Sequence, residues 1–403
     1  MKHRFIIIFA LFTFVTLVNS QSYFGSEPGS SGLYQYVTGV RGQGMGDVSL
    51  ALPDSVAPDA YGITQWQFLR HSRLVIGARY YLNQITVDNF HFTRSSIGLN
   101  HLVIVIPLIS YKWHLGFSLS PYSLNNIAFD RQYTQSVASY REVTSRQASL
   151  NKAQFATVWA PEPEIAVGVV YNYYFGVNIT EYKVLFDEGN FNDIRIRDEY
   201  RLAGRSVGFF LGMNAIPRVR LSGFVEVAPN ASAQRIYSYS FAGKLTVSES
   251  ENLDATIPAQ IGAGLAIRLS PNWIVAADGV YQNWSNGFGI QTPEVALADN
   301  WFHLGMGTEL AALRERHARL LRRVDWRWGI SVQKTGYRYA GNDIYRYAVH
   351  LGIGVPFFFG YNRMDFALRF GYRGDKKLEI IRENFIELNF GVSLGEKWFQ
   401  RIR

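Results

Sequence analysis

The most informative absence in this chain is cysteine, of which its 403 residues contain none. Disulfide bonds, thiolate metal sites and cysteine nucleophiles are therefore excluded. A lipoprotein carries a cysteine at its processing site, so lipid anchoring at that point is excluded as well. Whatever holds this large chain together must come from packing, hydrogen bonds and ion pairs.

Long apolar runs are also absent, apart from the N-terminus. Residues 1–20 contain basic Lys2 and Arg4, then an apolar stretch from Phe5 to Val18, and small residues ending at Ser20. This pattern is typical of a cleaved secretory signal peptide, and its apolar run is short for a membrane-spanning helix. We expect export to the cell envelope and no helical membrane spans.

Charge of one sign is not concentrated anywhere except at residues 314–323. The formal net charge is +8, and +6 without Lys2 and Arg4. The other basic residues are scattered, so a nucleic-acid partner is not expected. The seven histidines outside residues 1–20 have no His-x₃-His spacing, so neither a metal site nor a cofactor is expected.

What the chain does contain is a repeated alternation of apolar and polar residues. In the run from Arg323 to Gln333, Val324, Trp326 and Trp328 alternate with polar residues, which is the period of a β-strand. The same pattern predicts fourteen strands, at 72–82, 94–106, 111–120, 149–160, 164–177, 201–214, 218–228, 258–269, 272–284, 300–310, 323–334, 345–355, 362–371 and 384–394. Several reach the ~9–11 residues that a tilted strand needs to cross a bilayer.

The connections between these strands alternate in length. Five are short and contain proline, at 107–110, 161–163, 215–217, 270–271 and 356–361, and a sixth at 311–322 is expected to form a short helix. The others are expected to be long polar loops, at 83–93, 121–148, 178–200, 229–257, 285–299, 335–344 and 372–383. Short turns on one rim and long loops on the other are typical of outer-membrane barrels, with the short turns in the periplasm.

Two arrangements fit the alternation alone. In a soluble barrel Val324, Trp326 and Trp328 point inward, whereas in a membrane barrel they face lipid and polar residues line a wet lumen. Aromatic residues near strand ends favour the second, because they match interfacial girdles: Trp113, Trp159, Trp273, Trp284, Trp301, Trp398 and Phe399. We predict an all-β protein, a fourteen-stranded antiparallel transmembrane barrel at 72–394 with a periplasmic tail at 395–403.

Four segments support this assignment through a resemblance to the FadL/TodX-type outer-membrane transporters of hydrophobic compounds. They are "RGQGMGDVSLALPDS" (41–55), "SLNKAQFATVWAPEPEIAVGVVYNYYFG" (149–176), "IPAQIGAGLAIRLSPNWIVAADGVYQNWS" (257–285) and "FIELNFGVSLGEKWF" (385–399). The resemblance implies a barrel with an N-terminal hatch in its lumen and passive uptake of fatty-acid-like or aromatic molecules across the outer membrane.

One stretch departs from that family. Its members commonly carry Asn-Pro-Ala after the Gly-Met-Gly segment, whereas residues 57–66 read "APDAYGITQW". A related branch, the PorV-like proteins, uses the same barrel as a shuttle or scaffold in protein secretion. That alternative implies secretion-system proteins as partners in place of a hydrophobic ligand. A sealed lumen with well-ordered outer loops favours the scaffold, and a wall gap beside an apolar pocket favours transport.

Residues 21–71 are expected to form the hatch, because a barrel of this size is too wide to be filled by its own side chains. Gly42, Gly44 and Gly46 allow tight turns close to the wall. We hypothesise that hatch carboxylates pair with wall arginines and latch the hatch, the candidates being Asp47, Asp54, Asp59, Arg327, Arg363 and Arg369. The barrel is expected to be a monomer surrounded by outer-membrane lipid.

An apolar ligand needs apolar residues inside the lumen. Phe224, on the polar side of its strand, and Ile63 and Trp66 in the hatch are the candidates, with simple packing as the alternative. No catalytic residues are assigned. Ser393 in "GVSLG" lies inside the last strand, not at the strand–helix turn that a nucleophile requires. An outer-membrane hydrolase would need a serine within hydrogen-bond reach of His114, His303 or His350, which are placed to face the lumen.

Overall fold

A computed structural model describes residues 22–26, 30–87, 90–134, 139–187, 191–290, 296–312, 323–358, 360–374 and 381–396. The expected signal peptide, most of the connection at 311–322 and the tail beyond Glu396 lie outside these ranges. No helix in the described ranges is long and apolar enough to cross a membrane.

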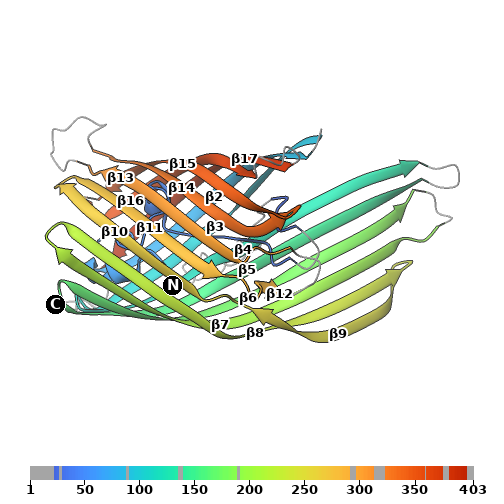
Figure 1. The fold of residues 1–403 in the computed structure, drawn as a ribbon, viewed down its shortest axis with the longest axis horizontal. Helices are drawn as coiled ribbons and strands as arrows, with labels where there is room; N and C mark the ends of the chain where they lie inside the picture. The colour runs from blue at the N-terminus through green and yellow to red at the C-terminus, as the bar shows by residue number, and fades with distance from the viewer. Residues whose placement is uncertain are drawn as a thin grey trace, which may run out of the picture.

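Within these ranges fourteen antiparallel strands close into a barrel, as the alternation predicted (Figure 1). The last strand pairs with the first over sixteen residues, from Ile381↔Val87 to Glu396↔Ser72. The barrel strands are β2 (Ser72–Val87), β3 (Phe90–Ile109), β4 (Trp113–Thr134), β5 (Ser139–Glu162), β6 (Ile165–Phe186), β7 (Ile194–Ile216), β8 (Val219–Phe241), β10 (Gln260–Ser270), β11 (Trp273–Asn283), β13 (Asn300–Leu310), β14 (Asp325–Tyr339), β15 (Asn342–Phe357), β16 (Asn362–Gly374) and β17 (Ile381–Glu396).

The barrel has a tall side and a short side. Strand β5 has 24 residues whereas β11 has 11, and Figure 1 shows β4 to β9 extending well beyond the other strands. Strand β9 (Lys244–Thr256) pairs with the upper half of β8, while the lower half of β8 pairs with β10. We call the extended parts of β4 to β9 the palisade.

The palisade corrects the prediction of long polar loops. Residues 121–148, 178–200 and 229–257 are mostly continued strand, joined by short connections such as Ala242–Gly243. The reason is physical: beyond the membrane both faces of a strand meet water, so pairing persists while hydrophobic alternation disappears. Strand β9 illustrates this, since its residues from Lys244 to Asn252 are all exposed.

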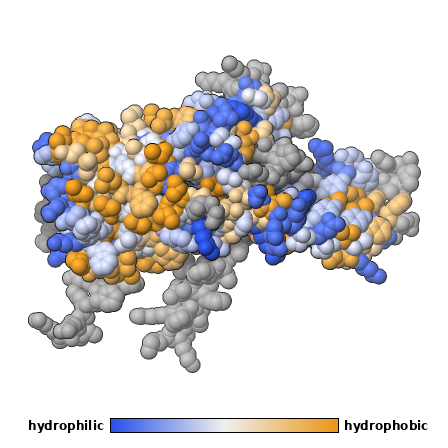
Figure 2. Space-filling model, turned by 60° about the horizontal axis from the view of Figure 1, so that its bottom comes forward, coloured by the Kyte–Doolittle hydropathy of each residue, from blue (hydrophilic) through white to orange (hydrophobic). Residues whose placement is uncertain are grey.

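The side chains divide as a membrane barrel requires. In β14, Asp325 and Arg327 are buried on the inner face, while Trp328 and Ile330 are 42% and 54% exposed on the outer face. Figure 2 shows hydrophobic residues gathered over the barrel part of the visible face. Burying charge in the lumen with ionic partners avoids the ~2–4 kcal/mol that an arginine costs at mid-bilayer on the lipid face.

The aromatic girdle is confirmed only in part. Trp113, Trp159 and Trp273 are exposed on the outer face, at the ends of their strands. Trp284 and Trp301, also expected there, are 1% and 0% exposed and pack inside the barrel. Both lie at inward-facing positions of the alternation. The alternation therefore predicted their side correctly, whereas the preference of tryptophan for membrane interfaces did not.

One seam of the wall is incomplete. Strands β3 and β4 pair from Ile109↔Trp113 only as far as Leu102↔Leu119. Beyond that point β4 pairs instead with the short strand β1 (Leu33–Tyr34), through Leu33↔Leu124. In the described part of the chain the upper halves of β3 and β4 are joined by a hydrogen bond, which Arg94 Nη2 donates to the Ala128 carbonyl oxygen at 2.9 Å.

The N-terminal segment lies inside the barrel. After β1 it forms a single helical turn, α2 (Val40–Gln43), and a 3₁₀ helix, η2 (Ile63–Phe68). Nearly all residues from Ser30 to Leu69 are buried, and the segment contacts strands around the wall. We keep the name hatch for residues 22–71.

Candidate functional site

One close approach between hatch and wall is made by backbone on both sides. A Cβ added at Gly46, where φ is +84°, would lie 2.6 Å from the carbonyl oxygens of both Met306 and Ile330. Only glycine adopts this conformation at such short range without strain. The turn Gly44–Met45–Gly46, which we call the hatch loop, therefore rests directly on the wall.

The wall is built to receive this loop. Four inward-facing glycines lie opposite it, namely Gly305, Gly307, Gly329 and Gly352. At Gly329 an added Cβ would stand 2.2 Å from the Gly46 nitrogen, and at Gly307 it would stand 2.2 Å from the Met45 oxygen. The contact leaves no room for a side chain or a water molecule. Hatch backbone and wall backbone are therefore in direct contact at this place.

The first ionic cluster joins the hatch to β13 and β16. Asp54 lies 2.5 Å from the Arg363 guanidinium and 3.1 Å from that of Arg41. Arg41, on α2, also forms two hydrogen bonds to Glu309, at 2.7 and 2.9 Å. Burial alone raises the pKa of Asp54, but the two guanidinium groups outweigh burial and hold the pKa at about 2. The carboxylate is thus ionised throughout the physiological range.

A second cluster joins the hatch loop to β16 and β17. Asp47, directly after the loop, lies 2.9 Å from Arg369, which in turn lies 2.7 Å from Glu387. Burial alone raises the pKa of Asp47, and Arg369 reverses this to a net lowering. Removing one partner of such a buried pair costs ~3–5 kcal/mol, because the other charge stays buried and uncompensated.

The two remaining latch candidates are placed differently from the hypothesis. Asp59 accepts hydrogen bonds from the backbone N–H groups of Gly39 and Tyr61, so it organises the hatch internally. Arg327 pairs with three wall carboxylates, at 2.6, 3.1 and 2.7 Å: Glu309, Asp325 and Asp365. Its link to the hatch runs through Glu309, which Arg41 shares. The structure thus brings Asp47 and Asp54 to wall arginines, but not Asp59.

Sequence reasoning missed three members of these clusters, Arg41, Glu309 and Glu387. The signal was present for the two glutamates, since both lie on the polar side of strands that otherwise alternate cleanly. Their long-range partners could not be read from the sequence, because Arg41 and Glu309 are separated by 268 positions.

The candidate ligand residues lie in packed surroundings. Ile63 and Trp66 are both 0% exposed, and Phe224 stacks on Phe210 with ring centroids 4.8 Å apart. Trp66 donates from Nε1 to the Asp59 carbonyl at 3.0 Å. All of these side chains except Asp59 belong to one continuous apolar and aromatic core. Their role in binding a ligand stays a prediction, and the geometry displays packing.

The pockets that we find inside the lumen are very small. One, beside the hatch loop and lined by Val48 and His101, measures about 20 Å³, and another, lined by Leu150 and Leu202, about 10 Å³. Ligand sites for drug-sized molecules usually measure ~300–1,000 Å³. At both places hatch and wall residues leave little free space, in contrast to the wide wet lumen that the polar strand faces suggested.

A serine–histidine contact does occur. Ser331 Oγ lies 2.8 Å from His350 Nε2, and His350 Nδ1 lies 2.7 Å from the Gln43 carbonyl. Because a carbonyl only accepts, Nδ1 carries the proton and Nε2 accepts from the serine. His350 is completely buried under the hatch, so the pair joins wall to hatch. The Ser393 hydroxyl likewise donates to the Val56 carbonyl of the hatch.

Comparison with solved structures shows the same fold in outer-membrane proteins. A Pseudomonas aeruginosa FadL homologue is 11% identical, with 90% of this chain and 98% of that chain covered and a TM-score of 0.61. The Pseudomonas putida toluene transporter TodX is 13% identical, with 90% and 97% covered and a TM-score of 0.57. The CymD monoaromatic hydrocarbon channel is 13% identical, with 92% and 99% covered and a TM-score of 0.57.

None of these three is named as an enzyme. Among curated proteins no sequence match was found. A family model described as BamG matches residues 1–403, the full length of the chain.

Proposed function

The chain belongs to the BamG family, and from this premise we propose that it is a sealed outer-membrane barrel that acts as a binding or scaffold component for other proteins of the cell envelope. The single observation that carries the proposal is the glycine-to-glycine contact between hatch loop and wall. A channel must open a path through its hatch, whereas here backbone rests on backbone and ionic clusters flank the contact.

The palisade supplies a surface for such a partner. Its last strand, β9, pairs with β8 on one side, and on the other side the described residues pair it with β12 (Gly289–Ile290) at Ala255 and Thr256 alone. Among the described residues the rest of this edge has no strand partner, and such an edge is a template for strand addition by another chain. Exposed Leu245 and Val247 add apolar contact area.

Shortening the β8–β9 hairpin tests the scaffold function. Deleting residues from Tyr237 to Glu249, which are paired in register, and restoring a two-residue turn removes most of the free edge. We expect proteins cross-linked to the full-length chain in native membranes to be lost from the shortened variant, while the barrel keeps its heat-modifiable migration on gels.

The matched control shortens the β14–β15 hairpin at its Arg338↔Asp343 tip, which lies outside the palisade. It should retain the cross-linked proteins. If the full-length chain captures no protein in membranes, or if both deletions capture equal amounts, the scaffold function is wrong.

The incomplete seam favours a second candidate, passage of small hydrophobic molecules. The β3–β4 gap begins at Leu102 and Leu119, beside the buried aromatic residues Tyr122 and Tyr34. A molecule leaving the lumen sideways would pass between these two strands. Liposomes containing the purified chain should, on the scaffold proposal, take up toluene or a fatty acid no faster than empty liposomes; faster uptake would favour the channel.

A further inference from the structure

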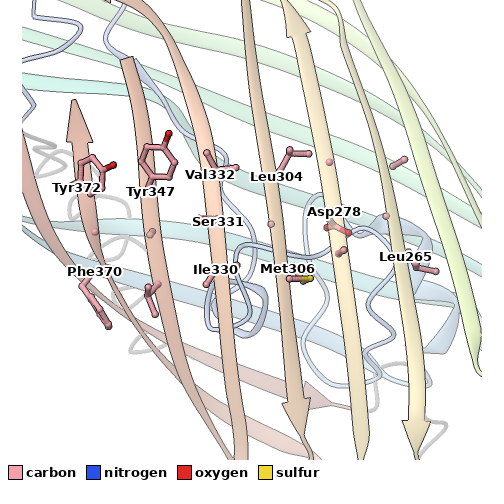
Figure 3. Close-up of a pocket in the computed structure, with 18 of the residues that line it drawn as sticks. Leu265, Asp278, Leu304, Met306, Ile330, Ser331, Val332, Tyr347, Phe370 and Tyr372 are labelled. Atoms are coloured by element: carbon pink, nitrogen blue, oxygen red, sulfur yellow. The ribbon is translucent and has the colours of Figure 1, made fainter. Parts of the chain in front are cut away.

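A cavity in the described part of the chain lies outside the lumen. It is a groove of about 890 Å³ on the lipid-facing wall, crossing β10, β11 and β13 to β16 (Figure 3). Its floor is formed at Ala263, Ala277 and Gly279, which are small residues at outward positions where most neighbours are large. We call it the outer groove.

The outer groove lies back to back with the hatch loop. Met306 and Ile330 line the groove with their side chains, and the carbonyl oxygens of these same residues meet Gly46 from the inside. The wall has no side chain between hatch and backbone at this place, because the inward positions are glycines. The hatch loop therefore touches the inner side of the wall at the place where the outer groove hollows its outer side.

One end of the groove is aromatic and basic. Tyr347 and Tyr372 stack there with ring centroids 5.1 Å apart, and Figure 3 shows them beyond Ile330 and Phe370. The Arg382 guanidinium lies 5.6 Å from the centroid of the Tyr372 ring and is exposed on the outward side of β17. Tyrosine and arginine in this order along a barrel wall mark the boundary between acyl chains and headgroups.

We propose that the outer groove is a binding site for an anionic lipid, with at least two acyl chains in the groove and a phosphate beside Arg382. Three observations identify this occupant. The lining is almost entirely apolar and lies in the lipid-facing belt. The volume falls within the ~300–1,000 Å³ of small-molecule sites. Among the residues that the structure describes, Arg382 is a cation at its edge, and it lies on the rim that we expect to be extracellular, which points to the outer leaflet.

The site is independent of the scaffold function, because it uses none of the palisade. Bound acyl chains would support the thin wall from outside at the point where the hatch loop rests on it. Lipid binding then stabilises the sealed form, since it favours the state in which the groove exists.

The experiment is native mass spectrometry of the full chain, stripped of lipid in detergent and supplied with phosphatidylglycerol or phosphatidylcholine vesicles. We expect about tenfold more phosphatidylglycerol than phosphatidylcholine to be retained. Ala277→Phe, which fills the floor, should lose both lipids. Arg382→Gln should keep the acyl chains but lose the preference between the two headgroups.

Val169→Phe on the opposite wall is the matched control, because Val169 is also an outward, exposed residue of a barrel strand. Retention by Ala277→Phe equal to that of Val169→Phe would overturn the proposal, provided both variants migrate as folded barrels. Equal retention of the two lipids by the unmodified chain would refute the selection of an anionic headgroup by Arg382. Loss of a co-purifying protein instead of lipid would make the groove a protein interface and refute the proposal.

Discussion

Gly329→Val is the sharpest test of the seal between hatch and wall. The added Cβ would stand 2.2 Å from the Gly46 nitrogen and 2.3 Å from the Met45 carbonyl carbon, and both are backbone atoms. Restoring an ordinary contact of ~3.5 Å requires the hatch loop to retreat by about 1.3 Å. Overpacking of this kind costs ~1–3 kcal/mol.

The retreat should also weaken the pair between Asp47 and Arg369, because Asp47 follows Gly46 directly and the pair spans only 2.9 Å. A wall without its seal admits water and ions. In planar lipid bilayers the unmodified chain should show little ion conductance, whereas Gly329→Val should show frequent channel openings. Cells carrying the variant should become sensitive to large antibiotics that the outer membrane normally excludes.

Gly223→Val is the control, since a Cβ at Gly223 would meet a single atom, the Gly262 carbonyl oxygen, at 3.3 Å. It should conduct no more than the unmodified chain. A Gly329→Val barrel that is folded, inserted and as silent as Gly223→Val would refute the reasoning that this contact seals the lumen.

Three further predictions concern the hatch. Arg363→Ala and Arg369→Ala should each destabilise the hatch by ~3–5 kcal/mol and raise conductance, whereas unchanged conductance in both would end the latch hypothesis. The pKa of Asp54 is lowered to about 2, below ~3.9 for an unfolded aspartate, so its stabilising effect is complete above about pH 4 and is lost as the pH falls towards 2; conductance should rise over that window. Trp66→Ala should lower the midpoint of thermal unfolding, because a large buried side chain contributes ~3–5 kcal/mol; if Trp66 instead bound a transported molecule, the variant would slow uptake without loss of stability.

Much of the barrel could be predicted because a strand's alternation is a local property. Trp328 and Arg327 are adjacent in the chain, and their opposite environments follow from the period of two. The palisade could not be predicted in the same way, since successive residues of β9, which point to opposite faces, are all exposed from Lys244 to Asn252 and no contrast between faces remains. Trp284 and Trp301 show a different error. They were predicted to face the membrane interface because tryptophan prefers it, although the alternation of their strands places them inside.

In the candidate site, too, some features follow from the local sequence and others only from the tertiary structure. Asp47 and Asp54 were recognised as hatch carboxylates, and Arg363 and Arg369 as inward-facing arginines, because burial of such charges demands a partner. Which carboxylate meets which arginine depended on the path of the hatch. Asp59 was therefore hypothesised to pair with a wall arginine, although its oxygens accept from the hatch backbone at Gly39 and Tyr61.

By itself the sequence determined a closed antiparallel barrel, because alternation, strand length and proline turns are encoded over a few neighbouring residues and each strand repeats them. Only the tertiary structure decided that the hatch loop rests on the wall, since this contact joins Gly46 to Gly329, far apart in the sequence, and glycine carries no side chain from which such a contact could be read. The same holds for the outer groove, where the wall is thin because backbone meets backbone.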